Sequence, residues 1–238
     1  MPLWIAATLA AFFVKGLCGF ANTLVFTSVL SFGVSNAGIS PVELLLGLPT
    51  NAILAWRERR SLDLSLCLPL AALVLLGCVP GALFLRNADT RLVKLAFGVL
   101  IIVLSAQMLA QELRPRPARL SRVVLGVIGL LSGLLCGLYG VGALLGAYVS
   151  RVARDSHAFK ANLCFVFLTE NLFRIGLYAV CGLLTPAALL RALILAPFML
   201  AGLFLGMRSA GMIAERTARR LVIALLLVSG VSLIGACL

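Results

Sequence analysis

The chain has 238 residues, of which 62% are hydrophobic and 12% are charged, and its formal net charge is +12. Soluble domains carry about a quarter charged residues, so this composition excludes a water-soluble globule. The basic residues lie in short loops such as WRERRSLD, where they set membrane topology and contact acidic lipid headgroups, so a nucleic-acid partner is not expected.

Long apolar segments follow one another from end to end, which is typical of a helical protein that crosses the bilayer several times. Barrel strands would alternate with a period of two residues, and these segments do not. In chain order the segments are 3–33, 41–56, 64–85, 92–110, 121–150, 158–181, 187–207 and 218–237.

A basic linker at 111–122 divides these segments into two groups of four. The groups look duplicated: LCGF at Leu17 matches LCGL at Leu135, and LPTN ending at Asn51 matches LTEN ending at Asn171. The sequence therefore predicts one integral membrane domain, 1–238, built from repeat one (1–112) and repeat two (119–238). Internal repeats of this kind are typical of secondary transporters.

The first and fifth segments each contain a glycine-rich break, KGLCGFAN at 15–22 and SGLLCGLYGVG at 132–142. A continuous helix of about 30 residues would be roughly 45 Å long, against a hydrocarbon core of about 30 Å. Each segment either crosses once as a broken helix or dips in and returns as a re-entrant hairpin. The helices are expected to restart near 20–23 and 141–144.

The distribution of lysine and arginine between loops favours hairpins. If all eight segments cross, the two faces receive 10 and 8 basic residues, whereas re-entrant first and fifth segments give 14 and 4. The predicted fold is an all-α polytopic membrane protein with two inverted repeats, each of three transmembrane helices plus one re-entrant broken-helix hairpin. The alternative is eight crossings in two parallel four-helix repeats.

The breaks are candidate sites for an anion, because a helix that restarts presents unpaired N–H groups and the positive end of its dipole. Ionisable residues inside the membrane are costly and therefore candidates for function. The predicted substrate-binding residues are Lys15, Gly19, Phe20, Asn22, Asn51, Gly140, Gly142, Asn171 and Arg174. Glu170 is the candidate for a coupling proton, because a carboxylate at membrane depth is costly to keep ionised unless Arg174 pairs with it.

Each of these candidates also has a purely structural interpretation. The breaks' glycines can serve close helix packing, a lysine near a break can snorkel to the surface, and asparagines can join helices by hydrogen bonds. An acid and a base four residues apart can neutralise each other on one helix. The residues concerned are Gly16 and Gly133, Lys15, Asn51 and Asn171, and the pair Glu170 and Arg174.

The quoted motifs and the closing stretch RRLVIALLLVSGVSLI resemble the sulfite exporter TauE/SafE family over about residues 5–235. The resemblance implies transport of sulfur-containing or carboxylic anions across the bacterial inner membrane, with sulfite, sulfoacetate and related sulfonates as the substrate class. The expected partners are a small anionic substrate, the lipid bilayer and, as one possibility, a second copy in a homodimer.

Three alternatives compete with a secondary transporter of sulfite or an organosulfonate. An enzyme would need a nucleophile with a base or a cluster of metal ligands, whereas the chain has one histidine, expected in a loop, and is expected to have no paired carboxylates in its apolar segments. Seven cysteines without short spacing predict neither a disulfide framework nor a zinc site, so no cofactor or metal is expected. The other candidates are a transporter of another carboxylate or inorganic anion, and a membrane assembly factor that transports nothing.

Overall fold

A computed structural model of the chain describes residues 1–30, 33–87 and 122–210, with scattered residues within 95–110 and 220–234. Within this part every regular element is a helix. The predicted segments 92–110 and 218–237 and the linker between the proposed repeats fall largely outside the described residues.

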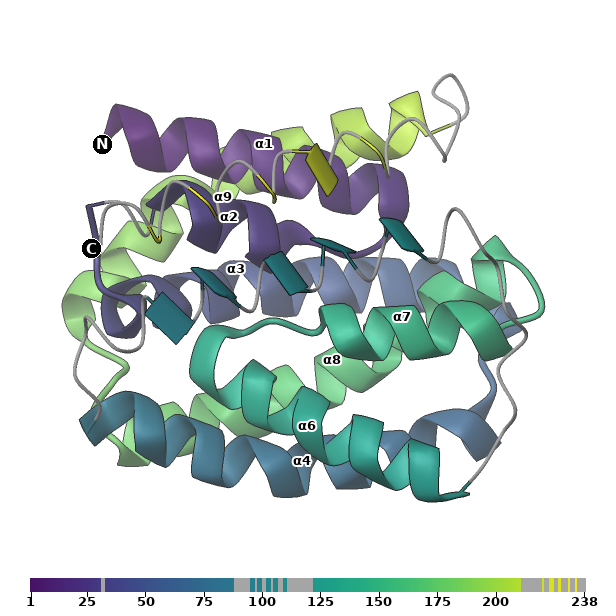
Figure 1. Cartoon of the computed structure of the whole chain (residues 1–238). Coiled ribbons are helices and arrows are strands. Elements are labelled where there is room, and N and C mark those ends of the chain that lie inside the picture. The colour runs from purple at the N-terminus through teal and green to yellow at the C-terminus, as the bar shows by residue number, and fades with distance from the viewer. Residues whose placement is uncertain are drawn as a thin grey trace.

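The described helices follow the predicted segments closely (Figure 1). Four of them are long and apolar enough to span a membrane: Gly38–Arg57, Leu64–Leu85, Ser156–Val180 and Pro186–Ser209. In chain order the elements are α1 (Pro2–Cys18), α2 (Asn22–Leu30), α3 (Asn36–Arg57), the 3₁₀ turn η1 (Arg59–Ser61), α4 (Leu64–Asn87), α6 (Arg122–Tyr139), α7 (Ala143–Val152), α8 (Ser156–Val180) and α9 (Pro186–Ser209).

The first predicted break separates α1 from α2. Gly19 ends α1 in the left-handed region, with φ 83°, and its N–H donates to the carbonyl oxygen of Lys15 at 2.7 Å. Glycine adopts this conformation without the steric cost that a side chain adds, which is why the helix ends here. Ala21 has φ 71°, and α2 restarts at Asn22, inside the predicted interval.

The second break repeats this geometry between α6 and α7. Gly140 has φ 71°, and its N–H donates to the carbonyl oxygen of Cys136 at 2.8 Å. Helix α7 restarts at Ala143, again inside the predicted interval. The two breaks therefore have the same backbone geometry, in which a glycine in the left-handed region ends the first helix of the segment.

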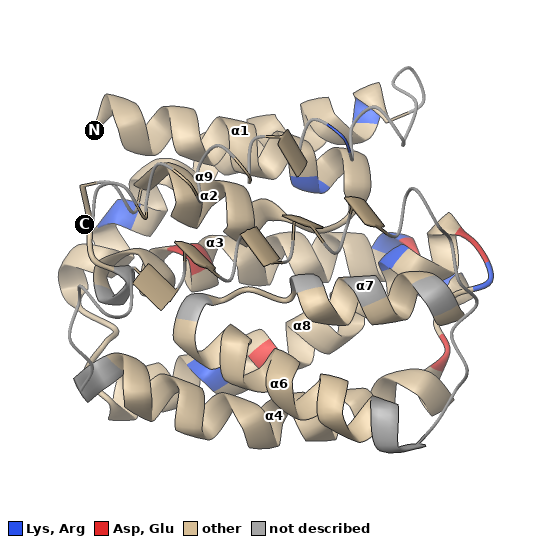
Figure 2. Cartoon of the chain, viewed as in Figure 1, with Lys and Arg blue, Asp and Glu red and all other residues tan. Residues whose placement is uncertain are grey.

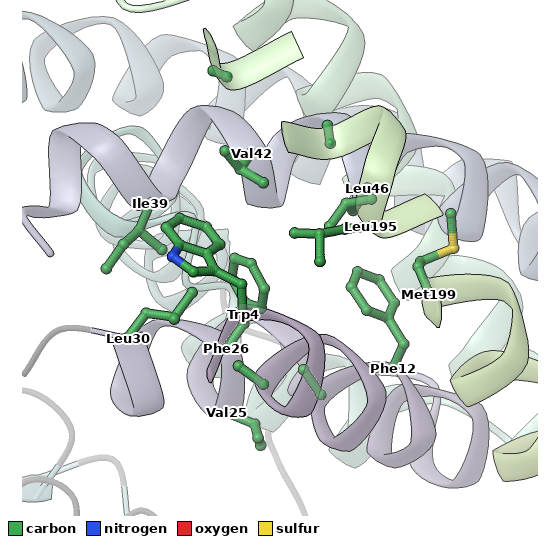
Figure 3. Packing of buried hydrophobic residues seen from close by; sticks show 14 residues of the cluster. Trp4, Phe12, Val25, Phe26, Leu30, Ile39, Val42, Leu46, Leu195 and Met199 are labelled. Atoms are coloured by element: carbon green, nitrogen blue, oxygen red, sulfur yellow. The ribbon is translucent and has the colours of Figure 1, made fainter. Parts of the chain in front are cut away.

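The arms of the first broken segment fold back on each other. The ring of Trp4, near the start of α1, packs edge-on against the ring of Phe26 in the second half of α2, with centroids 5.9 Å apart. Both belong to a hydrophobic cluster that also contains Leu30, Ile39 of α3 and Leu195 of α9 (Figure 3). The start of α1 and the end of α2 thus lie at the same end of the molecule.

Helices α3 and α8 pack side by side and run in opposite directions. At one end Glu58, just after α3, contacts His157 in the first turn of α8, with 2.8 Å between Oε2 and Nδ1. Toward the other end Glu43 of α3 reaches Arg174 of α8. The sequence comparison matched these two segments as equivalents in the duplication. Equivalent helices that run in opposite directions are expected when one repeat is inverted relative to the other.

Helices from one predicted repeat pack on helices from the other, through glycines. Gly16 lies against α9, where an added Cβ would come within 2.7 Å of the backbone nitrogen of Met207. Gly133 lies against α4, where an added Cβ would come within 2.9 Å of the Cα of Gly77. The alternative interpretation of these two glycines as packing residues is confirmed: α1 pairs with α9, and α6 pairs with α4.

Charged loops gather at the end where α3 finishes and α8 begins (Figure 2). Helix α9 also finishes there, since Nη1 of Arg57 lies 3.3 Å from the sulfur of Met207. The opposite end carries Arg191, stacked 4.6 Å over the ring of Trp4. The described basic residues at the first end are Arg57, Arg59, Arg60, Arg154, Lys160 and Arg208.

Candidate functional site

Both breaks and both antiparallel helices meet at one small cavity of about 20 Å³. The first turn of α2 and the residues just before α7 form two of its walls, and α3 and α8 form the others. The positive ends of two helix dipoles therefore lie at the cavity. Its lining residues are Phe20, Ala21, Asn22, Thr23, Leu24, Glu43, Asn51, Gly140, Gly142, Phe167, Glu170, Asn171 and Arg174.

Most of the residues that the sequence singled out line this cavity, and two of them do not. The lining residues among the candidates are Phe20, Asn22, Asn51, Gly140, Gly142, Glu170, Asn171 and Arg174. Lys15 is buried and reaches the wall through Asn51. Gly19 faces the side chain of Lys160, whose Cγ would lie 2.7 Å from an added Cβ. That these residues bind substrate stays a prediction.

Arg174 occupies the centre of the polar cluster. Its Nη1 donates to the carbonyl oxygen of Cys136 at 2.5 Å, at the end of the first arm of the second break. Its Nη2 lies 3.4 Å from Oε2 of Glu43, and its Nε lies 3.2 Å from Oε1 of Glu170. The pairing of Glu170 with Arg174 along one helix is therefore present, but the guanidinium is shared with a second carboxylate.

That second carboxylate, Glu43, was missed in the sequence. Its Oε1 accepts hydrogen bonds from Nδ2 of Asn22 at 2.8 Å and from the hydroxyl of Thr23 at 2.6 Å, both in the first turn of α2. The signal was available, because Glu43 is an ionisable residue inside the apolar segment 41–56, the criterion that selected Glu170. The expectation of no paired carboxylates in the apolar segments was wrong: two carboxylates flank one arginine.

A chain of amides links the lysine beside the first break to this cluster. Nζ of Lys15 donates to Oδ1 of Asn51 at 2.7 Å. The amide of Asn171 is assigned with its nitrogen toward Oε2 of Glu170, at 2.7 Å, because a carboxylate oxygen can only accept; its oxygen then accepts from Nδ2 of Asn51 at 3.0 Å. The asparagines do join α3 to α8, and they also connect Lys15 to Glu170.

Four buried ionisable groups therefore share one hydrogen-bonded network. Lys15 and Arg174 are each 1% exposed, Glu43 is 3% exposed and Glu170 is 2% exposed. A buried charge is tolerated when it is paired or hydrogen-bonded. Arg174 is paired with both carboxylates, and Lys15 is hydrogen-bonded to the neutral amide of Asn51. When both carboxylates are ionised, their two negative charges balance the positive charges of Lys15 and Arg174. The network then has no formal net charge.

The cavity is smaller than the site of an oxyanion. A volume of about 20 Å³ holds roughly one water molecule. The ring of Phe167 closes on Gly142, at a position where any Cβ would overlap the ring. The network can surround a small anion only after the hairpin tips or the aromatic ring move apart. Within the described residues no group of three or more His, Cys, Asp or Glu side chains is placed to hold a metal ion.

Comparison with known protein families matches this chain to one of them. The family described as Sulfite exporter TauE/SafE matches residues 3–233, which is almost the whole chain. Searches of curated proteins and of solved structures return no match. Because the family match covers nearly the full length, the chain belongs to the sulfite exporter TauE/SafE family of membrane transporters.

Proposed function

We propose that the protein is a secondary transporter, acting as an exporter, of a small sulfur-containing anion such as sulfite or an organosulfonate. The observation that carries this proposal is the convergence of both helix breaks on one buried cavity that also holds Arg174 and two asparagine amides. Open backbone at membrane depth is tolerated where it lines a cavity, and broken helices at mid-depth are how many transporters bind ions. In a bacterial cell the compartment would be the inner membrane.

The substrate sits between the two breaks in this proposal. Arg174 and Lys15 supply positive charge, Asn51 and Asn171 donate from their amides, and the first turns of α2 and α7 contribute their dipoles. The glycines at 19, 140 and 142 let the backbone approach the anion closely. Glu170 is the carboxylate predicted from the sequence to bind a coupling proton, and Glu43 is the alternative residue for that role.

The two halves are proposed to be inverted repeats. The equivalent helices α3 and α8 run antiparallel, and the pairing of α1 with α9 is mirrored by that of α6 with α4. A pseudo-two-fold axis in the membrane plane produces both relations. The segments containing α1–α2 and α6–α7 are then re-entrant hairpins that enter from opposite faces, and the fold-back of Trp4 on Phe26 supports this for the first.

Transport would alternate between states that open the cavity to one face and then to the other. The cavity of about 20 Å³ corresponds to a closed state in such a cycle. Rocking of one repeat against the other would separate one hairpin tip at a time from α3 and α8.

The experiment is transport of radiolabelled sulfite by purified protein in proteoliposomes, with a carboxylate and an inorganic anion as competitors. Lys15→Met and Arg174→Lys are expected to lower the rate at least tenfold, because one removes a cation and the other removes the planar fork of donors. Lysine is chosen at 174 because an uncharged residue would leave Glu43 and Glu170 without a counter-ion. Arg208→Met, which removes an exposed cation, is the matched control and should transport normally.

Two results would contradict the proposal. If the wild-type protein moves no more sulfite or sulfonate than empty liposomes do, the proposal that it transports this class of anion is wrong. If a carboxylate competes better than the sulfur-containing anions, the substrate is a carboxylate instead. Unchanged rates in both site variants would remove the anion site from this cavity.

A further inference from the structure

The second carboxylate of the site, Glu43, links three helices. It lies on α3, its two short hydrogen bonds go to the start of α2, and its ionic contact goes to Arg174 on α8. It is not among the site residues predicted from the sequence. Building on the proposed transport function, we propose that Glu43 takes up the coupling proton, and that one proton accompanies each monovalent anion, so that transport is electroneutral and reversible, and export is driven by a high internal concentration of the anion.

The charge balance of the site requires a partner for the anion. Lys15 and Arg174 balance Glu43 and Glu170 when both acids are ionised. A monovalent anion entering this buried network adds one uncompensated negative charge, which is strongly disfavoured away from water. A proton on one of the two carboxylates restores neutrality and leaves the guanidinium with an excess of positive charge for the anion.

The environment of Glu170 makes it the less suitable proton carrier. Its ionic partner Arg174 lies four residues further along the same helix, and Asn171 is its neighbour in sequence. These contacts stay together however α8 moves as a rigid body. Its remaining contact is with the thiol of Cys78 on α4, at 3.7 Å.

The contacts of Glu43 are all made to other helices. Its distance to Arg174, 3.4 Å, is the longer of the two ionic contacts of that arginine, and its strongest bonds are with neutral donors on the hairpin tip. Displacement of either α2 or α8 relative to α3 therefore changes the surroundings of Glu43. Protonation of Glu43 is therefore coupled to displacement of α2 or α8 relative to α3, which is the kind of movement that alternating access requires.

The charged and titratable groups around Glu43 come from three packed elements. Arg174 and Glu170 face it from α8, Lys15 is near it on α1, and the thiol of Cys136 is near it on α6. Helix α2 contributes only the neutral side chains of Asn22 and Thr23.

The proton step is a simple transfer between water and one carboxylate. A hydronium ion at one face transfers a proton to a carboxylate oxygen of Glu43 and becomes water. This converts one acceptor into a donor and weakens the contact with Nη2 of Arg174. That nitrogen is then available to the anion. After the site opens to the opposite face, the anion leaves, Glu43 returns its proton to water there, and the contact with Arg174 is restored.

The test uses methanesulfonate in proteoliposomes, because this sulfonate stays a monoanion across the working pH range and pH then acts on the protein alone. In the wild type an inward proton gradient should accumulate radiolabelled methanesulfonate, and a potassium diffusion potential should change the accumulation less than twofold. Glu43→Gln mimics the protonated acid. It should keep anion-for-anion exchange within about threefold of the wild type but lose accumulation driven by the gradient.

Two companion variants make the outcome decisive. Glu58→Gln removes a carboxylate outside the site, and both exchange and gradient-driven accumulation should remain. Glu170→Gln leaves Glu43 able to take up a proton, so methanesulfonate should still accumulate under the gradient, but less than in the wild type, because the loaded site no longer needs a proton for charge balance. If Glu170→Gln loses gradient drive and Glu43→Gln keeps it, the assignment to Glu43 is overturned.

A wild-type measurement covers the case in which Glu43→Gln does not fold. Proton uptake recorded with an internal pH dye in weakly buffered liposomes should equal the methanesulfonate taken up, one for one. A ratio of zero or two would overturn the proposed stoichiometry. Absence of any exchange by the wild type would instead count against the transport function itself, so the two failures are distinguishable.

Discussion

One guanidinium holds together the elements around the cavity. Arg174 contacts a backbone carbonyl at the end of α6, one carboxylate on α3 and one on its own helix. Its loss would leave Glu43 and Glu170 buried without their cation. Removing one partner of a buried ion pair is far more damaging than replacing the pair, because the remaining charge stays uncompensated.

This difference gives a prediction for stability. Arg174→Gln should lower the free energy of unfolding by about 3–5 kcal/mol, the usual cost of stranding a buried charge. The double variant Arg174→Gln, Glu170→Gln should recover part of that loss, because one of the stranded carboxylates is neutralised. Thermal melting in detergent measures both, with Arg208→Gln, which changes an exposed arginine, as control. A double variant as unstable as the sum of its single changes would show that the two residues are not coupled.

The polar residues of the site could be selected from the sequence, but their partners could not. Lys15, Asn51, Asn171 and Arg174 stand out because each is costly in an apolar segment. The bond between Lys15 and Asn51 and the contact between Glu43 and Arg174 join residues far apart in the chain. Such contacts depend on the angle and depth at which helices pack, and no local pattern encodes those quantities.

At the scale of elements, close packing between helices rests on glycine. Helix α6 approaches α4 so closely that a side chain at Gly133 would overlap the backbone of α4 at Val74 and Gly77. Lipid chains are as apolar as the helix surfaces, so association depends on such backbone contact rather than on the hydrophobic effect. The second break is anchored by this interface, because Cys136 and Gly140 lie at the end of the same helix.

A pair of glycines on one helix provides a matched test. Gly133→Ala should destabilise the protein and reduce transport, because α6 must shift away from α4 to accommodate the methyl group. Gly126→Ala adds the same methyl group where no atom lies within 4 Å of the added Cβ, so its melting temperature should stay the same or rise slightly. Equal melting temperatures for the two variants would show that the interface does not depend on close approach at Gly133.

The element boundaries near the breaks were predictable, and the pairing of helices was not. Glycines between apolar stretches indicated where α1 and α6 end, because a left-handed residue closes each arm. Small residues at regular spacing indicate that one face of a helix packs closely against another helix, but they do not indicate which helix that is. The pairing of α1 with α9 and of α4 with α6 follows from the three-dimensional arrangement of the whole chain.

At the scale of the whole molecule, an apolar surface is combined with one strongly basic end. Large hydrophobic side chains are exposed along α4 and α9, where lipid would cover them, and they include Leu68, Leu76, Phe84, Leu193 and Phe204. The basic end contains the finish of α3 and the start of α8 in contact. From the positive-inside rule we predict that this end faces the cytoplasm.

The contact between those two loops separates the competing topologies. If the hairpins are re-entrant, two crossings separate the finish of α3 from the start of α8, which returns the chain to the same face. If all eight segments cross, three crossings separate them and the loops would lie on opposite faces. The contact of Glu58 with His157, at 2.8 Å, is compatible with the first arrangement.

Labelling of single introduced cysteines tests this topology directly. Arg59→Cys and His157→Cys, both at exposed positions of the basic end, should react with a membrane-impermeant maleimide only from the cytoplasmic face. Ala187→Cys, exposed in the first turn of α9 at the opposite end, should react only from the outer face. The parent protein serves as the blank, and its six described cysteines are buried. Labelling of Arg59→Cys and His157→Cys from different faces would establish eight crossings, and the two breaks would then belong to helices that traverse the bilayer.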